Sequence, residues 1–230
     1  MTNATQTWRQ YWVAEKCRVA ERLSSGEAGG GYAEASILVC AVLSALAAEL
    51  WVGRNIDRAR FTEMLVRHGA SANECRRVSI PLLVQYLEAN SSVLEAQEIR
   101  HAFSLPNSAR VVTGPDVDQL EQDVFSVCPQ LELKVLRGFS YASVLYSEIR
   151  SSYAHEYKPG EFADSWPMTT LAYQNVSYIN RMDDSSIMRR LVHFHIEWLV
   201  QLANELASVV DMQADVLPLS KPAVWWIDGG

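Results

Sequence analysis

The stretch from Ala35 to Val52 reads A-S-I-L-V-C-A-V-L-S-A-L-A-A-E-L-W-V and is the longest apolar run in the chain. Its length approaches that of a membrane span, which needs about 20 apolar residues. It also contains Ser36, Ser44 and Glu49 and is rich in small alanines. A single span would leave most of this mixed-polarity chain outside the membrane, so we expect a buried central helix rather than a membrane helix.

Apolar residues at helical spacing predict further helices on both sides of this stretch. The run G-E-A-G-G-G at 26–31 breaks the chain just before it, and we interpret that run as a flexible hinge. Asp57 is a good N-cap for the next helix, and a short strand could form at Pro129–Leu136, where apolar and polar residues alternate. The predicted helices are Thr7–Leu23, Tyr32–Leu50, Asp57–Gly69, Ser79–Asn90, Val93–Phe103, Asp116–Phe125, Phe139–Tyr157 and a last long one from Asp184 or Ser185 to Val209.

These elements predict an all-α fold, a helical bundle in a single domain over residues 1–230. The segment Glu161–Arg181 is aromatic-rich and irregular, so we expect a long loop there. Residues 211–230 are too rich in proline to extend the last helix and form a C-terminal tail. We expect Trp225 and Trp226 of this tail to pack against the body, and the alternative is that they stack on bases.

The composition fits a globular protein of one large domain, or of two small ones. Hydrophobic residues make up 49% and charged residues 20%, which argues against extensive disorder. The formal net charge of −7 argues against a protein held to nucleic acid mainly by bulk charge, although it leaves a local phosphate site open. The start shows no secretory signal, and the four cysteines form no C-x-x-C pair. We therefore expect reduced thiols and a cytoplasmic protein.

The most informative stretch for function is Y-S-E-I-R-S-S-Y-A-H-E-Y-K-P-G, residues 146–160. It places Arg150 and His155 in the pattern R-x-x-x-x-H at the end of a predicted helix. Arg190 and His195 repeat this spacing, so spacing alone identifies neither pair. The context favours the first pair, because the second lies inside the apolar stripe of the predicted last helix. Positions five apart on a helix diverge by about 140°, so convergence would need the long arginine side chain, the helix end or a second copy.

These residue types suit chemistry on a phosphate group. An imidazole titrates near neutrality and can move a proton, whereas a guanidinium stays charged and binds phosphate oxygens. Glu148 precedes His155 by seven residues on the same helical face, so it could orient the imidazole. The alternative is structural: a surface arginine, and a histidine that benefits from the negative end of the helix dipole.

The segment R-S-S-Y-A-H-E-Y, residues 150–157 and called the signature segment below, resembles the signature of the HEPN superfamily. That signature is an arginine and a histidine separated by four to six residues near a helix end. The added tyrosine resembles the R-x-x-x-x-H-x-Y form of HEPN toxins paired with nucleotidyltransferase antitoxins. The stretch S-I-L-V-C-A-V-L-S-A-L-A-A-E-L-W-V-G-R-N-I-D-R-A-R-F, residues 36–61, is similar to the buried helix and D-R-x-R-F turn of bacterial HEPN-like proteins. The last helix also falls where such proteins have theirs, so the resemblance spans residues 32–210.

The resemblance implies a helical bundle, often a homodimer, that cleaves RNA without a metal ion or cofactor and leaves a 2′,3′-cyclic phosphate. Carried onto this sequence, His155 would draw the proton from the ribose 2′-hydroxyl, and Arg150 would stabilise charge on the phosphate. Tyr157 would match the residue that antitoxin partners modify with nucleotide. The chain would then be the toxin or effector of a bacterial defence or toxin–antitoxin pair.

Ser151 departs from the family pattern, because active members often carry asparagine, aspartate or histidine at this position. The alternative function is therefore a non-catalytic HEPN-like module that binds a nucleotide or a protein partner. Asp57, Arg58 and Arg60 could form a cleft edge, or else an N-cap followed by solvated helix charges. The two histidines of H-F-H, with Glu197, suggest a metal site, but only the first shares a helical face with Glu197. No third ligand is evident, so we expect no metal.

Overall fold

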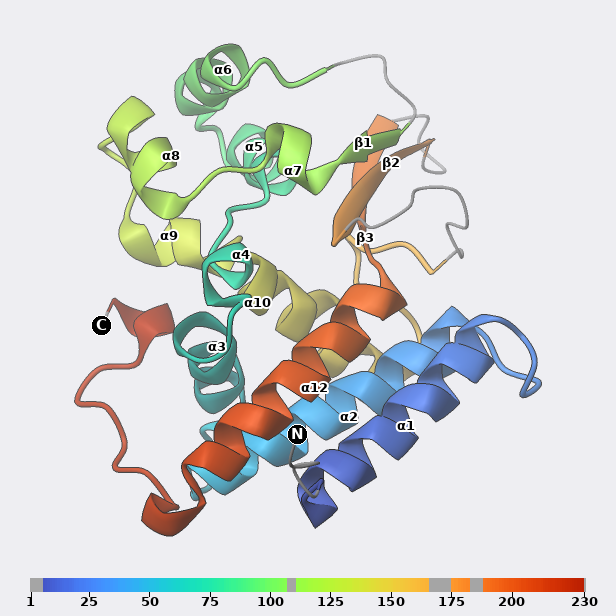
Figure 1. The fold of residues 1–230 in the computed structure, drawn as a ribbon. Helices are drawn as coiled ribbons and strands as arrows, with labels where there is room; N and C mark the ends of the chain where they lie inside the picture. Colours follow the sequence, from blue (N-terminus) through green and yellow to red (C-terminus); the bar gives the residue numbers. More distant parts are fainter. Residues whose placement is uncertain (1–5, 107–110, 166–174, 183–187, 230) are drawn as a thin grey trace, which may run out of the picture.

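The computed structural model describes residues 6–106, 111–165, 175–182 and 188–229. The fold is mostly helical and contains a small antiparallel sheet in the order β1-β2-β3 (Figure 1), so the all-α prediction is right for most of the chain and wrong for this sheet. The α-helices are α1 (Trp8–Ser24), α2 (Tyr32–Leu50), α3 (Asp57–Arg67), α4 (Ala72–Cys75), α5 (Ile80–Ala89), α6 (Val93–Ala102), α7 (Gly114–Val117), α8 (Glu121–Val127), α9 (Leu133–Gly138), α10 (Tyr141–Val144), α11 (Ser152–Glu156) and α12 (Ile196–Met212). The other elements are the strands β1 (Val111–Thr113), β2 (Val176–Met182) and β3 (Met188–Phe194), the π-helix η1 (Leu145–Ser151) and the 3-10 helices η2 (Ala214–Val216) and η3 (Trp226–Asp228).

Three long helices, α1, α2 and α12, pack against one another and form one side of the molecule (Figure 1). α2 carries the long apolar run, which lets it contact α1, α3 and α12 at once. Arg9 on α1 joins the three helices by pairing with Glu49 of α2 and Asp211 of α12. By length and composition α2 is apolar enough to cross a membrane, and half of its apolar window is buried in the fold.

The predicted last helix is wrong over residues 188–194, where the chain forms strand β3, and α12 begins only at Ile196. Its predicted start at Asp184 or Ser185 lies outside the described residues. β2 and β3 pair antiparallel, with Val176 opposite Phe194 and Tyr178 opposite Val192. Residues 190–194 of β3 are all buried, so the strand lacks the polar and apolar alternation of a half-exposed strand. The apolar residues of β3 fall at the same helical spacing as those of α12, so the sequence pattern reads as one helix. Pairing with β2 makes residues 188–194 a strand instead.

Three local predictions also change. The region of the possible strand Pro129–Leu136 contains the start of helix α9 instead. Asp57 is the first residue of α3, and Ile56 before it is the N-cap without a side-chain hydrogen bond. Asp57 still lies in the first turn, where its charge is favourable. The long loop expected at 161–181 contains β2, and its residues 166–174 lie outside the described part of the chain.

The C-terminal tail packs against the body, as predicted. Glu63, buried on α3, accepts a hydrogen bond of 2.7 Å from the backbone N–H of Trp226, and Arg137 donates one of 2.7 Å to the Trp226 carbonyl. The Arg137 guanidinium also lies over the Trp226 ring, 4.9 Å from its centroid. Trp225 meets the ring of Trp51 edge-on. The tail therefore closes the core over α3 and α9.

A buried carboxylate joins the sheet to two helices. Asp118 is fully buried and accepts hydrogen bonds from the hydroxyls of Tyr178 on β2 and Tyr141 on α10, both at 2.5 Å. It also accepts one of 2.9 Å from the backbone N–H of Ile80 at the start of α5. Burial raises the pKa of Asp118 to about 7, although these hydrogen bonds act in the opposite direction. Asp118 thus fixes the start of α10, from which the signature segment continues.

Candidate functional site

The helix predicted from Phe139 to Tyr157 forms over 141–156, but its middle is a π-helix. α10 passes without a break into η1, Leu145–Ser151, and then into α11. The Ser152 hydroxyl donates a hydrogen bond of 2.9 Å to the carbonyl of Ser147, five residues earlier. π-turns are rare and are frequent at functional sites. The signature segment therefore begins within an unusual backbone feature that the apolar periodicity did not predict.

Arg150, near the end of η1, is half-buried and points towards the middle of α2. Its Nε donates a hydrogen bond of 3.3 Å to the hydroxyl of Ser44, and its guanidinium lies over the Tyr146 ring, 5.2 Å from the centroid. Tyr146 is itself held edge-on against Phe61 of α3. Among the described residues, no carboxylate forms an ion pair with Arg150. Its positive charge is therefore positioned but not neutralised, which suits binding of an anion.

His155 and Tyr157 lie at the exposed end of the signature segment. Tyr157 ends α11 in the left-handed conformation, with φ of 54°, and its hydroxyl donates a hydrogen bond to Glu34 in the first turn of α2. This bond lowers the pKa of Glu34 and raises that of Tyr157. Because Arg150 contacts α2 at Ser44 and Tyr157 contacts it at Glu34, the signature segment runs antiparallel along α2.

Within the described residues, no hydrogen bond, ion pair or ring contact joins Arg150 to His155. Five residues along a helix separate the two positions by about 7 Å along its axis. Arg150 turns towards α2, whereas His155 is exposed in the last turn of α11. A substrate or a second copy of the chain would have to bring the two groups to one reacting phosphate.

Glu148 holds the loop after the signature segment. Its carboxylate accepts a hydrogen bond of 3.0 Å from the backbone N–H of Phe162, and its carbonyl accepts one of 2.7 Å from Gly160. A Cβ at Gly160 would clash with the Glu148 carboxylate, so this position needs glycine. Glu148 thus bonds to the backbone of this loop, and in the described chain no contact with the His155 imidazole supports the expected orienting role. Ser151 is half-buried and ends the π-helix.

The predicted cleft edge lies near the other end of α2. Arg60 pairs with Asp57 three residues before it and donates a hydrogen bond of 3.3 Å to the carbonyl of Trp51. These contacts fix the turn between α2 and α3. Arg58 is exposed. Asp57 is not the N-cap that the structural alternative expected, and it forms an intrahelical ion pair with Arg60.

The second R-x-x-x-x-H pair is part of the core. Arg190 is buried on β3 and donates a hydrogen bond of 2.7 Å to a backbone carbonyl. His195 is buried, and its Nε2 lies 2.8 Å from the Ser177 hydroxyl. His193 stacks on Tyr32 at 4.5 Å, and burial lowers the pKa of both histidines, that of His193 to about 3. Over the described ranges, no group of three or more His, Cys, Asp or Glu side chains could hold a metal ion.

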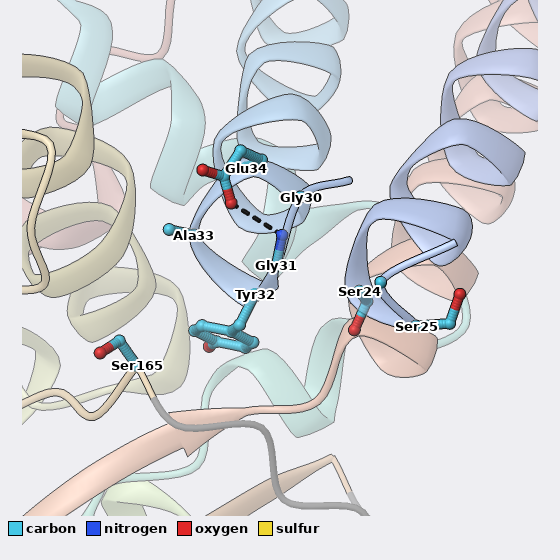
Figure 2. A pocket seen from close by; sticks show the side chains of 9 residues that line it. Ser24, Ser25, Gly30, Gly31, Tyr32, Ala33, Glu34 and Ser165 are labelled. Atoms are coloured by element: carbon cyan, nitrogen blue, oxygen red, sulfur yellow. Dashed lines mark hydrogen bonds between the residues drawn. The ribbon is translucent and has the colours of Figure 1, made fainter. Parts of the chain in front are cut away.

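A hollow of about 490 Å³ opens between the end of α1 and the start of α2 (Figure 2). Its single charged lining residue in the described chain is Glu34, whose carboxylate accepts a hydrogen bond of 2.9 Å from the backbone N–H of Gly31. The one sequence signal for this hollow is the glycine run at 26–31, for which the sequence pattern predicts a hinge. The hollow is lined by Ser24, Ser25, Gly26, Gly30, Gly31, Tyr32, Ala33, Glu34 and Ser165.

Unsatisfied polar atoms gather behind the inner wall of this hollow. Ser36 Oγ, Tyr153 Oη and His193 Nδ1 are buried without a hydrogen-bond partner. All three side chains neighbour Tyr32, and the Tyr153 hydroxyl also approaches Ser165 without meeting hydrogen-bond geometry. Ser36 likewise approaches Tyr32, and His193 approaches the backbone of Asp164, without meeting hydrogen-bond geometry. Buried polar groups usually have partners, so these three atoms are exceptions.

Comparison with known proteins gives no relative for this chain. No family model matches the sequence, and no curated protein or solved structure is significantly similar to it. A functional interpretation therefore depends on the residues themselves, above all on Arg150, His155 and the hollow at the start of α2.

Proposed function

We propose that this chain is a metal-independent endoribonuclease of the HEPN type that acts in the cytoplasm as a homodimer. The observation that carries the proposal is Arg150, a guanidinium held in place by Ser44 and Tyr146 and left without a carboxylate partner in the described part of the chain. An exposed imidazole, His155, follows on the same helical segment. A fixed cation and an accessible proton carrier are the minimum that RNA cleavage through the 2′-hydroxyl requires.

In the proposed reaction, His155 takes the proton from a ribose 2′-hydroxyl, and the 2′-oxygen attacks the adjacent phosphorus. The bond from phosphorus to the 5′-oxygen breaks, that oxygen takes up a proton from water, and the exposed His155 returns its own proton to the solvent. The products are a 2′,3′-cyclic phosphate and a 5′-hydroxyl, so no cofactor or redox partner is needed. Arg150 stabilises the charge that grows on the phosphate oxygens. A general acid–base group such as His155 contributes about 10²- to 10⁴-fold in rate.

Two features support a homodimer. Arg150 and His155 do not touch within one chain, so a second copy can supply the missing group. Two small side chains are exposed nearby in the sequence: Ala41, three residues before Ser44 on α2, and Ala154, next to His155 on α11. Small side chains let another pair of helices approach closely. The exposed Tyr157 would be the contact point for an antitoxin partner, where added nucleotide would crowd the site with negative charge.

The second candidate function is a non-catalytic module that binds a nucleotide or a protein partner. The separation of Arg150 from His155 favours it, because binding needs no convergence of the two groups on one phosphate. Under this alternative, Arg150 would bind phosphate while Ser151, which departs from the family pattern, would mark the loss of turnover.

The experiment is RNA cleavage by the purified full chain in EDTA, over a broad RNA panel, with Arg150→Ala and His155→Ala. Matched controls are Arg54→Ala and His101→Ala, which remove an exposed arginine and an exposed histidine elsewhere. We expect cleavage to survive chelation, to fall about 100-fold or more in the two site variants, and to persist in the controls. An intact chain that binds RNA or nucleotide through Arg150 without cutting would instead support the binding module.

A further inference from the structure

The hollow at the start of α2 adjoins the signature segment through one side chain. Oε2 of Glu34 accepts the hydrogen bond from Gly31 inside the hollow, and Oε1 accepts the hydrogen bond from Tyr157 at the end of the segment. A ligand seated in the hollow would therefore lie next to Tyr157, at the end of the signature segment. Figure 2 shows Glu34, Tyr32 and Ser165 around this space.

The chemistry of the lining selects against phosphate. None of the described lining residues is basic, and the one charged group is the Glu34 carboxylate, which only accepts hydrogen bonds. Ser24 and Ser165 add hydroxyls, and Tyr32 adds the edge of an aromatic ring. A ligand that fits must carry N–H or O–H donors for the carboxylate and a flat or polar body for the rest of the wall. An unstacked nucleobase meets both requirements.

We propose that the hollow binds one unstacked guanine base of the RNA, with Glu34 as the specificity-determining residue. The involvement of RNA rests on the proposed function. Guanine presents two parallel donors, N1–H and the N2 amino group, which match the two oxygens of a carboxylate. Each Glu34 oxygen has a second lone pair for this purpose beside its bond to Gly31 or to Tyr157. Adenine and cytosine present one amino donor beside a ring acceptor, and uracil presents one N–H between two carbonyl oxygens. Only guanine therefore gives a carboxylate a bidentate partner without placing an acceptor against it.

The inner wall offers partners for the other edge of the base. Guanine O6 and N7 are acceptors, so they need donors opposite Glu34. The hydroxyl of Ser165 lines the hollow, and the hydroxyl of Tyr153 behind it is buried without a hydrogen-bond partner.

The test is nucleoside binding to the full chain, measured by calorimetry, without RNA and without cleavage. We expect guanosine to bind at least about tenfold more tightly than adenosine, cytidine or uridine, because one charge-assisted hydrogen bond is worth that much. Inosine lacks the N2 amino group and should bind about tenfold more weakly than guanosine. Equal affinity for guanosine and inosine, or no binding of guanosine, would overturn the proposal.

Three variants sharpen this test. Glu34→Gln should remove the preference for guanosine, whereas Glu49→Gln, at the other end of α2, should keep it. If Glu34→Gln unfolds, Ser24→Phe adds bulk to the lining of the hollow, leaves Glu34 unchanged, and should abolish guanosine binding. The Arg150→Ala and His155→Ala double variant should bind guanosine as tightly as the unmodified chain.

The failures of the two proposals are distinguishable. If the chain binds guanosine in this way but cuts no RNA, the proposed guanine site stands and the proposed ribonuclease function is wrong. If the chain cuts RNA in EDTA but binds guanosine no better than inosine, the proposed ribonuclease function stands and the proposed guanine site is wrong.

Discussion

The hydroxyl of Tyr178 donates a hydrogen bond of 2.5 Å to the fully buried carboxylate of Asp118, 60 residues earlier in the chain. Tyr141 donates a second to the same carboxylate oxygen. Desolvation is still the larger effect, since the pKa of Asp118 is raised to about 7. The centre of the fold therefore contains an acid that titrates near neutral pH.

Asp118 should make stability depend on pH. Its pKa is raised on folding, so its contribution is complete below about pH 4 and is lost as the pH rises towards 7. Asp118→Asn, which does not titrate, should lack this loss. In urea unfolding, the unmodified chain should lose stability relative to Asp118→Asn by up to about 1.4 kcal/mol per pH unit across that window. A difference between the two proteins that stays constant with pH would contradict this prediction.

His193 should have the opposite dependence. Burial lowers its pKa to about 3, so it contributes stability that is complete above about pH 6.5 and is lost as the pH falls. His193→Phe keeps a ring against Tyr32 and removes the titration. Between pH 6 and pH 4, the unmodified chain should therefore lose stability relative to His193→Phe, again measured by urea unfolding. Parallel pH profiles for the two proteins would refute the assignment.

Gly114 should not tolerate a side chain, whereas Gly138 should. A Cβ at Gly114 would overlap the Tyr141 hydroxyl and lie 3.0 Å from the Asp118 carboxylate and 3.1 Å from Val176. We expect Gly114→Ala to cost about 1–3 kcal/mol of unfolding free energy. A Cβ at Gly138 meets nothing within 4 Å, so Gly138→Ala in the last turn of α9 should be neutral or slightly stabilising. Equal effects of the two substitutions would contradict the packing around Asp118.

Trp226 should contribute far more stability than Trp8. Trp226 is 3% exposed and lies under the Arg137 guanidinium, whereas Trp8 on α1 is 75% exposed. We expect Trp226→Ala to cost about 3–5 kcal/mol and Trp8→Ala to change stability by less than about 0.5 kcal/mol. Thermal and urea unfolding of both variants measure this. A small effect at Trp226 would show that the tail is not part of the core.

Local patterns predicted most of the helices. The apolar run at Tyr32–Leu50 gave α2 with its bounds, and Thr7–Leu23 matched α1 to within one residue at each end, because a helix buries a stripe that recurs every three or four residues. The same rule failed at 188–194. A short strand buried on both faces has no period of two, so its partner β2 decides its structure.

The sequence by itself determined which residue types could act on phosphate. It could not choose between two candidate pairs, because Arg150 with His155 and Arg190 with His195 both fit the pattern R-x-x-x-x-H. Only the tertiary structure distinguishes the two pairs. The sheet buries Arg190 and His195 and so removes them from water, whereas Arg150 lies against the surface of α2. The glycine run at 26–31 likewise determined a break in the chain. That these glycines line a hollow follows only from the tertiary structure. α1 packs against α2 on either side of them, and Ser165, far away in sequence, completes the wall.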